Sequence, residues 1–249
     1  NALETDINGG TLAALNTSTG RIEIDDVGAN TGLLTIGTVD GLAGVRNNAS
    51  AGGNPETTGF INISNASPIS VVDDINANGS ITLTTGDTDA INVDNLFIDD
   101  LDTGGGDLLI RSTAGSITLN VGDDAEIEGD LTAATIITIN MDQPGAGGAD
   151  AVVLTGGGTL DIQLDEAAGI AADAVLSTTG GTFINGGSQN DVFIFQAQST
   201  TNFIVNGNPP VFGDAGVPPG DTLQLDFTNI VNPPILAVGV PAAGVFSFQ

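Results

Sequence analysis

Short strands with one buried face are predicted throughout residues 79–141, and this pattern constrains the fold most. Apolar residues recur two positions apart, as in Ile81 and Leu83 or in Ile117 and Leu119. Side chains two apart lie on the same face of a strand, so the spacing indicates strands that bury one face. The residues between them are mostly Thr, Asn, Ser and Asp, which suit a face in contact with water.

Two near-copies of one strand lie in this region. GSITLT at 79–84 and GSITLN at 115–120 begin 36 residues apart. Short alternating strands, frequent turn residues and near-copies together predict a solenoid of stacked strands. The predicted fold class is therefore all-β, a parallel β-helix. Thr82 and Thr84 form one Thr-x-Thr pair, but the aligned array that ice-binding solenoids need is not visible in the sequence.

The composition changes near residue 180. Eight of the ten Phe and seven of the ten Pro follow that point. Larger side chains fill wider spaces, and Pro ends strands. Four strands are expected there, at 192–195, 202–205, 222–228 and 245–248. We predict a β-solenoid repeat region at 1–179 and a Phe/Pro-rich β capping or junction module at 180–249, because an open last strand would expose its edge.

A few segments depart from the strand pattern. Residues 46–59 and 142–150 are rich in Gly and polar residues and are predicted loops. The best helix candidate is 165–176, because acids occupy its first turn and apolar residues share one face. The apolar patch at 12–15 fits either a short helix or an end cap.

The net charge of −28 comes from 31 acids against three basic residues. Such a surface repels nucleic acid phosphates and anionic lipids, so neither is an expected partner. The most apolar stretch, 235–246, is too short and too interrupted by Pro to span a bilayer, and we expect no membrane insertion. Divalent cations are the natural counter-ions of such a chain.

Most catalytic chemistry is excluded by composition. The chain has no His, Cys, Lys, Tyr or Trp, so it can build no Ser-His-Asp or Cys-His relay, no Schiff base and no imidazole or thiolate metal site. Carboxylates remain, and a polysaccharide-active lyase or hydrolase is the enzymatic alternative. A lyase site would have to use Arg111, which we expect instead to lie outward beside an Asp. We therefore predict a protein that is not an enzyme.

Acidic residues gather in two places, where their hard oxygen ligands suit calcium. The alternative is a solvated acidic face. Four of the second group, from residue 124 to 130, alternate along what is expected to be one strand face. The residues of the two groups are Asp99, Asp100, Asp102 and Asp107, and then Asp123, Asp124, Glu126, Glu128 and Asp130.

Two resemblances follow from these motifs. GSITLTT and GSITLNV, preceded by ANG and TAG, resemble rungs of filamentous-haemagglutinin-type bacterial surface β-helices, mainly over 60–164. Residues 186–193 (GGSQNDVF) resemble one calcium-binding nonapeptide of the RTX type, with Gln189 where Gly is expected, and add Asp191 to the candidate metal ligands. The resemblance implies export to the cell exterior and an adhesive or structural role.

The predicted function is that of a non-enzymatic, extracellular structural or adhesive protein of a bacterial cell surface. It would form a β-solenoid rod, or the repeating subunit of a filament or surface layer, with Ca²⁺ as the candidate ion. Expected partners are further copies of the chain, which would associate through strand ends, or other surface proteins or glycans. Because the chain begins at Asn, we expect a processed form or a piece of a larger protein.

Overall fold

Every regular element of the described chain is a β-strand in this computed structural model. Among the described residues, no helix is long and apolar enough to cross a membrane. The structure describes residues 3–5, 9–26, 32–49, 58–86, 95–99, 108–122, 124–140, 159–162, 176–178, 182–185, 192–196, 203–206, 222–226, 236–237 and 245–248.

Sheet A has ten strands, and all are parallel up to β23. The last two strands in space are antiparallel additions at the C-terminal end, where β26 pairs with β23 and β25 pairs with β26. In spatial order they are β1 (Leu3–Thr5), β4 (Ile22–Asp26), β9 (Ile61–Asn65), β12 (Ile81–Thr85), β15 (Ile117–Asn120), β18 (Ile137–Asn140), β21 (Thr182–Asn185), β23 (Phe203–Asn206), β26 (Val245–Phe248) and β25 (Leu236–Ala237).

Sheets B and C are parallel throughout. Sheet B contains β2 (Gly10–Leu12), β5 (Leu34–Ile36), β10 (Ile69–Val71), β13 (Leu96–Ile98), β16 (Ala125–Ile127), β19 (Thr159–Ile162), β22 (Val192–Gln196) and β24 (Thr222–Asp226). Sheet C contains β3 (Ala14–Asn16), β8 (Val45–Asn47), β11 (Ile75–Ala77), β14 (Leu109–Ser112), β17 (Asp130–Ala133) and β20 (Leu176–Thr178).

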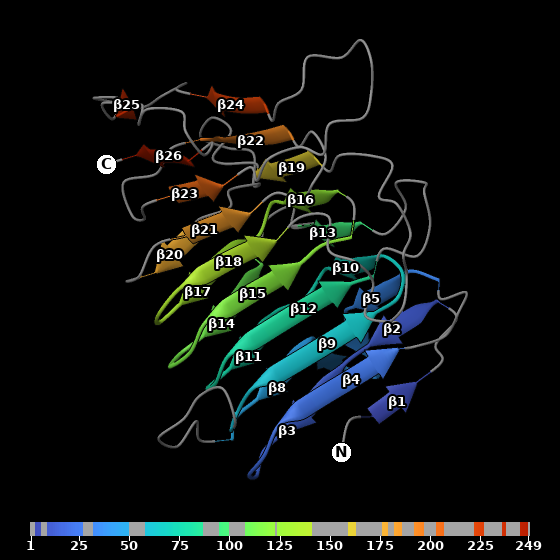
Figure 1. Cartoon of the computed structure of the whole chain (residues 1–249). Coiled ribbons are helices and arrows are strands. Elements are labelled where there is room, and N and C mark those ends of the chain that lie inside the picture. The colour runs from blue at the N-terminus through green and yellow to red at the C-terminus, as the bar shows by residue number, and fades with distance from the viewer. Residues whose placement is uncertain are drawn as a thin grey trace.

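The chain enters the three sheets in a fixed order, A then B then C, from β1 to β22. The short hairpin of β6 (Thr38–Val39) and β7 (Leu42–Ala43) is the one addition to this order in the described chain. We call three consecutive strands, one in each sheet, a rung. The rungs lie one above the next along the sheets, from the blue to the orange strands of Figure 1.

The register places like residues on like residues. The two near-copies are direct neighbours, because Ile81 lies beside Ile117 and Leu83 beside Leu119. The next strand continues both columns with Ile137 and then Ile139. All of these side chains are fully buried. Full burial of such an apolar side chain contributes roughly 1.5–3 kcal/mol, so these columns supply much of the core.

The corners between sheets differ in length, which explains the irregular spacing of the repeats. The corner from sheet C to sheet A has three residues after β11 and four after β14. The corner from sheet B to sheet C holds only Glu128 and Gly129 in one rung, and the β6–β7 hairpin in another. In that hairpin Asp40 and Gly41 both have positive φ, as a type I′ turn requires.

Several sequence predictions can be compared with these elements. The all-β class is confirmed for the described residues, and strands occur at all four expected C-terminal positions. The short-helix alternative at 12–15 is wrong, because Leu12 ends β2 and Ala14 and Leu15 belong to β3. The predicted loop at 46–59 begins two residues later than expected, since Arg46 and Asn47 complete β8, and 50–57 lie outside the described residues.

Three other predictions concern the second half of the chain. The predicted loop at 142–150 lies outside the described residues, as does the helix candidate up to residue 175, while Leu176 begins β20. Parallel strands of sheets A and B continue past residue 180 as β21 to β24. The division at 180 stays a prediction.

Candidate functional site

The first acidic group predicted to bind calcium follows β13, where the chain leaves sheet B. Asp99 is half-buried there, and the Ser70 hydroxyl donates a hydrogen bond of 3.3 Å to its Oδ2. Burial raises the pKa of the Asp99 carboxyl above its usual range, because desolvation disfavours the charged form, and the bond from Ser70 opposes the shift. The other predicted members of this group, Asp100, Asp102 and Asp107, lie outside the described residues.

The second acidic group does not occupy one strand face, contrary to the prediction. Glu126 lies in β16 of sheet B, whereas Asp130 begins β17 of sheet C. The chain turns between them at Gly129, where an added Cβ would meet the Leu108 and Ile98 side chains. Glycine at this position lets the chain turn within two residues. As a result, acids that alternate in the sequence lie in two different sheets. Asp124 and Glu128 flank β16 on either side.

The predicted calcium ligands are therefore only partly placed. Asp123 and Asp191 also lie outside the described residues. Within the described ranges, no three acidic side chains are grouped closely enough to hold a metal ion. Calcium binding by these residues stays a prediction.

Two arginines lie outward on sheet C. Arg46 and Arg111 are both exposed, and the register places Asn76 between them on the strand that separates β8 from β14. The outward position expected for Arg111 is thus confirmed. Its predicted pairing with an Asp is absent among the described residues, where the one ion pair joins Arg21 to Glu23 at 2.8 Å.

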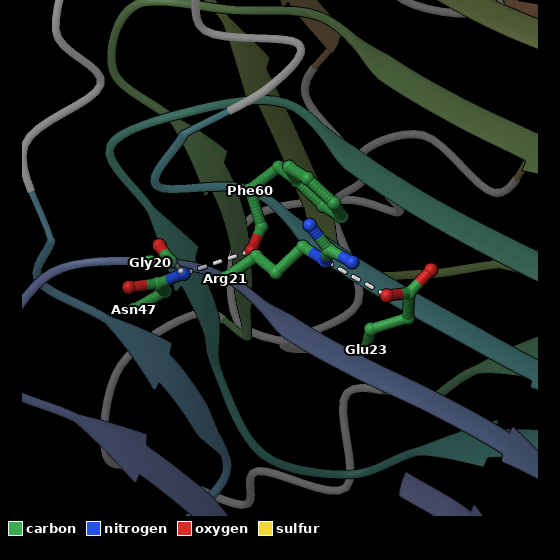
Figure 2. A network of polar contacts seen from close by, with 5 residues as sticks. All are labelled: Gly20, Arg21, Glu23, Asn47 and Phe60. Atoms are coloured by element: carbon green, nitrogen blue, oxygen red, sulfur yellow. Dashed lines mark hydrogen bonds and ion pairs between the residues drawn. The ribbon is translucent and has the colours of Figure 1, made fainter. Parts of the chain in front are cut away.

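The corner from sheet C to sheet A is closed by buried polar side chains. Asn47 donates from Nδ2 to the Phe60 carbonyl at 2.8 Å and to the Gly20 carbonyl at 3.3 Å. These three residues are labelled in Figure 2. Two rungs later Ser112 donates to the Gly79 carbonyl at 2.8 Å and accepts from the Gly115 amide at 3.0 Å. The Ser112 bonds give partners to a carbonyl and an amide of the tight corner, which buried backbone groups require. The Phe60 and Gly20 carbonyls also accept from backbone amides, so Asn47 adds a second bond to each.

An uncharged surface covers four consecutive strands of sheet A, β9, β12, β15 and β18. We call it the neutral face. Its side chains are all half-buried and occupy the positions between the inward Ile and Leu residues. The register arranges them in two columns, which are Asn62, Thr82, Thr118 and Thr138, and then Ser64, Thr84, Asn120 and Asn140.

Side-chain hydrogen bonds join the second column into an amide ladder. Asn120 donates to the Thr84 hydroxyl at 3.1 Å, Asn140 donates to Asn120 Oδ1 at 2.8 Å, and Asn185 of β21 donates to Asn140 Oδ1 at 2.9 Å. Each bond links neighbouring strands of sheet A. The ladder therefore holds its amides in one orientation at the strand spacing of about 4.8 Å.

The neutral face ends at charged side chains on one side and at apolar side chains on the other. At the N-terminal end, β4 presents Glu23, which pairs with Arg21, and Asp25. The Arg21 guanidinium also lies beside the Phe60 ring in Figure 2. Its distance from the ring centre is 5.6 Å. At the other end, Phe183 continues the first column and Ile204 follows it in β23. Outward acids of sheet A therefore lie on β4, and the next strand, β9, begins the uncharged columns.

Sequence reasoning did not find the neutral face. The Thr82 and Thr84 pair was noted, but the columns formed with Thr118 and Thr138 depend on strands 20 and 36 residues apart becoming neighbours. The usable signal was the repeat of Thr-x-Asn in GSITLN and TIITIN, each between inward apolar residues. Among the four strands, only β12 carries Thr in both columns. The strand before it carries Asn and Ser, and the two after it carry Thr and Asn.

Comparisons with protein-family models, with curated proteins and with solved structures gave no match.

Proposed function

We propose that this chain is a segment of a bacterial cell-surface rod, a three-sided β-solenoid with a structural or adhesive role. The observation that carries the proposal is the in-register stacking of like residues in three parallel sheets that the chain enters in turn. Such a stack extends by adding rungs, each of which contacts only its neighbours. Eight parallel strands of sheet A span about 34 Å at the usual strand spacing.

The surface charge agrees with an exposed, soluble rod. A net charge of −28 favours solubility. The GSITL near-copies and the resemblance to filamentous-haemagglutinin-type β-helices support the cell-surface assignment. Other surface proteins or glycans remain the proposed ligands of an adhesive rod.

Immunogold electron microscopy of the source cells tests the location, with a serum raised against this chain. We expect label along surface fibres or a surface layer on intact cells. Label confined to the interior of sectioned cells would overturn the proposal. Negative-stain images of the purified protein test the shape, and a spherical particle without a stacked cross-section would contradict the solenoid.

An enzymatic role is tested directly. The purified chain is incubated with pectin, alginate and similar polymers, and we expect no turnover. Turnover that disappears when one acid pair is replaced by amides would contradict the structural proposal.

Calcium belongs to the proposal as the ion bound by the two acidic groups predicted from the sequence. A ligand that binds only the folded state stabilises it by about 2.7 kcal/mol at a concentration of 100 Kd. We expect a higher melting temperature in CaCl₂ than in EDTA, with MgCl₂ at equal ionic strength as the control. Equal melting temperatures in CaCl₂ and EDTA would remove calcium from the proposal.

A further inference from the structure

We propose that the neutral face of sheet A is where two copies of this chain pack against each other, with their stacks antiparallel. This inference rests on the proposed structural role and names the surface through which such rods would associate laterally. It differs from the expected association through strand ends. The occupant is a second copy, for reasons of charge, spacing and orientation.

Charge is one condition on where two copies can meet. Each chain carries −28, so contact between acidic surfaces brings like charges together. Glu126 lies outward on β16 of sheet B, and Asp130 is the first residue of β17 in sheet C. Across the four strands of the neutral face no outward residue is charged. When the neutral faces of two copies are in contact, no acidic side chain of these four strands is buried against another.

Spacing selects a second copy over a single small ligand. Neighbouring strands lie about 4.8 Å apart, and the same repeat occurs by identity in another copy. Asn120 and Asn140 each use one N–H and accept one bond within the amide ladder, so each keeps one N–H and one lone pair for a partner. Because the ladder already orders these amides, association loses little side-chain entropy. In paired sheets of stacked identical strands, amide ladders run along each sheet while side chains of the two sheets interdigitate.

Orientation follows from the two ends of the face. If the stacks were parallel, the β4 strands would meet and Asp25 of one copy would lie near Asp25 of the other. A twofold axis along the strand direction reverses the stacks. It places the acidic β4 strand opposite β23, which carries Ile204, and β9 opposite β21, which carries Phe183, so like charges are kept apart. The strand β15, which is the middle one of the seven strands from β4 to β23, then meets its own copy.

Sedimentation velocity over a range of concentrations measures the association. We expect a monomer–dimer equilibrium that tightens when NaCl rises, because salt screens the repulsion between the acidic chains. The double variant Thr118→Asp and Thr138→Asp places four acids in the interface and should weaken dimerisation roughly 100-fold or more. Thr132→Asp is the matched control, since it adds a carboxylate outward on sheet C beside Arg111 and should leave dimerisation unchanged.

Single cysteines test the orientation, since the chain has no native Cys. Thr118→Cys lies on the middle strand and should form a disulfide-linked dimer on mild oxidation. Asn62→Cys should not link to itself, but it should link to Phe183→Cys when the two variants are mixed. Self-linking of Asn62→Cys as efficient as that of Thr118→Cys would overturn the antiparallel arrangement.

The remaining outcomes decide the proposal. A wild-type protein that is monomeric at every concentration overturns it, whether or not the face binds a glycan. Dimers that persist in the double Asp variant, with an unchanged urea midpoint showing that it folds, overturn it as well. Surface label on cells together with a monomeric protein would remove the neutral-face contact and leave the proposed function standing.

Discussion

Sheets A and C share the same alternation of inward and outward residues, but they fill their second inward column differently. In sheet A this column contains Leu83, Leu119 and Ile139, all fully buried. In sheet C the corresponding strands end in small residues, Ala77, Ser112 and Ala133, with Asn47 before them. One column is bulky and apolar, and the other is small or polar.

The difference shows that two columns of one core can be stabilised by different interactions. The second column of sheet A contributes burial of apolar surface. The second column of sheet C lies next to the corner into sheet A, where Asn47 and Ser112 bond the backbone of the turning chain. A bulky side chain there would compete with the corner for space. Mutations in the two columns should therefore differ in size and kind.

Leu119→Ala should have the largest effect, a loss of about 3–4 kcal/mol in the free energy of unfolding. The substitution removes buried apolar surface and leaves a cavity between Leu83 and Ile139. Urea denaturation followed by circular dichroism measures it. Thr118→Ala, outward on the same strand, is the control and should change little. A cost no larger than that of Ser112→Ala would contradict the contrast between the two columns.

Gly115→Ala should cost about 2–3 kcal/mol, because the corner has no space for a Cβ. An added Cβ would lie 2.7 Å from the Ser80 amide nitrogen and 2.9 Å from its Cα. Gly41→Ala is the control, since that glycine has positive φ but open space around it, and should cost about 1–2 kcal/mol. Equal urea midpoints for the two variants would show that the corner relaxes freely.

Ser112→Ala should cost about 1–2 kcal/mol through lost hydrogen bonds rather than lost packing. Ala already occupies the same column one rung before and one rung after, as Ala77 and Ala133, so the smaller side chain fits. The Gly79 carbonyl and the Gly115 amide lose their bonds to the hydroxyl. Hydrogen exchange at Gly115 measures the local effect, and unchanged protection there would refute a hydrogen-bonding role.

Asp99→Asn should have the smallest effect, and it should depend on pH. Because the pKa of Asp99 is raised in the folded protein, folding binds protons and stability falls as pH rises from the unfolded pKa of about 3.9 through the folded value. Asn cannot ionise and still accepts from Ser70. The variant should melt slightly higher than wild type at pH 7 and equally below about pH 3.5. A difference that persists at low pH would point to packing instead.

Much of the core could be predicted from the sequence, because alternation alone identifies the inward residues of a strand. The columns of Ile81, Ile117 and Ile137 follow from the GSITL near-copies and from TIITIN. Register could not be predicted so directly, since neighbouring strands are 36 residues apart in one case and 20 in the next. The neutral face depends on that register and was missed.

The acidic residues from 124 to 130 show a second reason for failure. Their alternation is the same as that of a strand, yet Glu126 and Asp130 lie in different sheets. The two-residue corner depends on Gly129, whose missing Cβ allows Leu108 and Ile98 to approach. A single Gly in an alternating segment gives no indication of whether the strand continues or turns.

The direct pairing of the two near-copies has a consequence for how the length of this protein can change. Both copies begin with Gly-Ser-Ile-Thr-Leu, and both follow a corner from sheet C to sheet A. Deletion of residues 79–114 would join Asn78 to Gly115 and place Ile117 beside Ile61, where Ile81 lies now. Gene rearrangement between the near-copies would therefore remove or duplicate one complete rung, and the columns above and below it would meet in the same register.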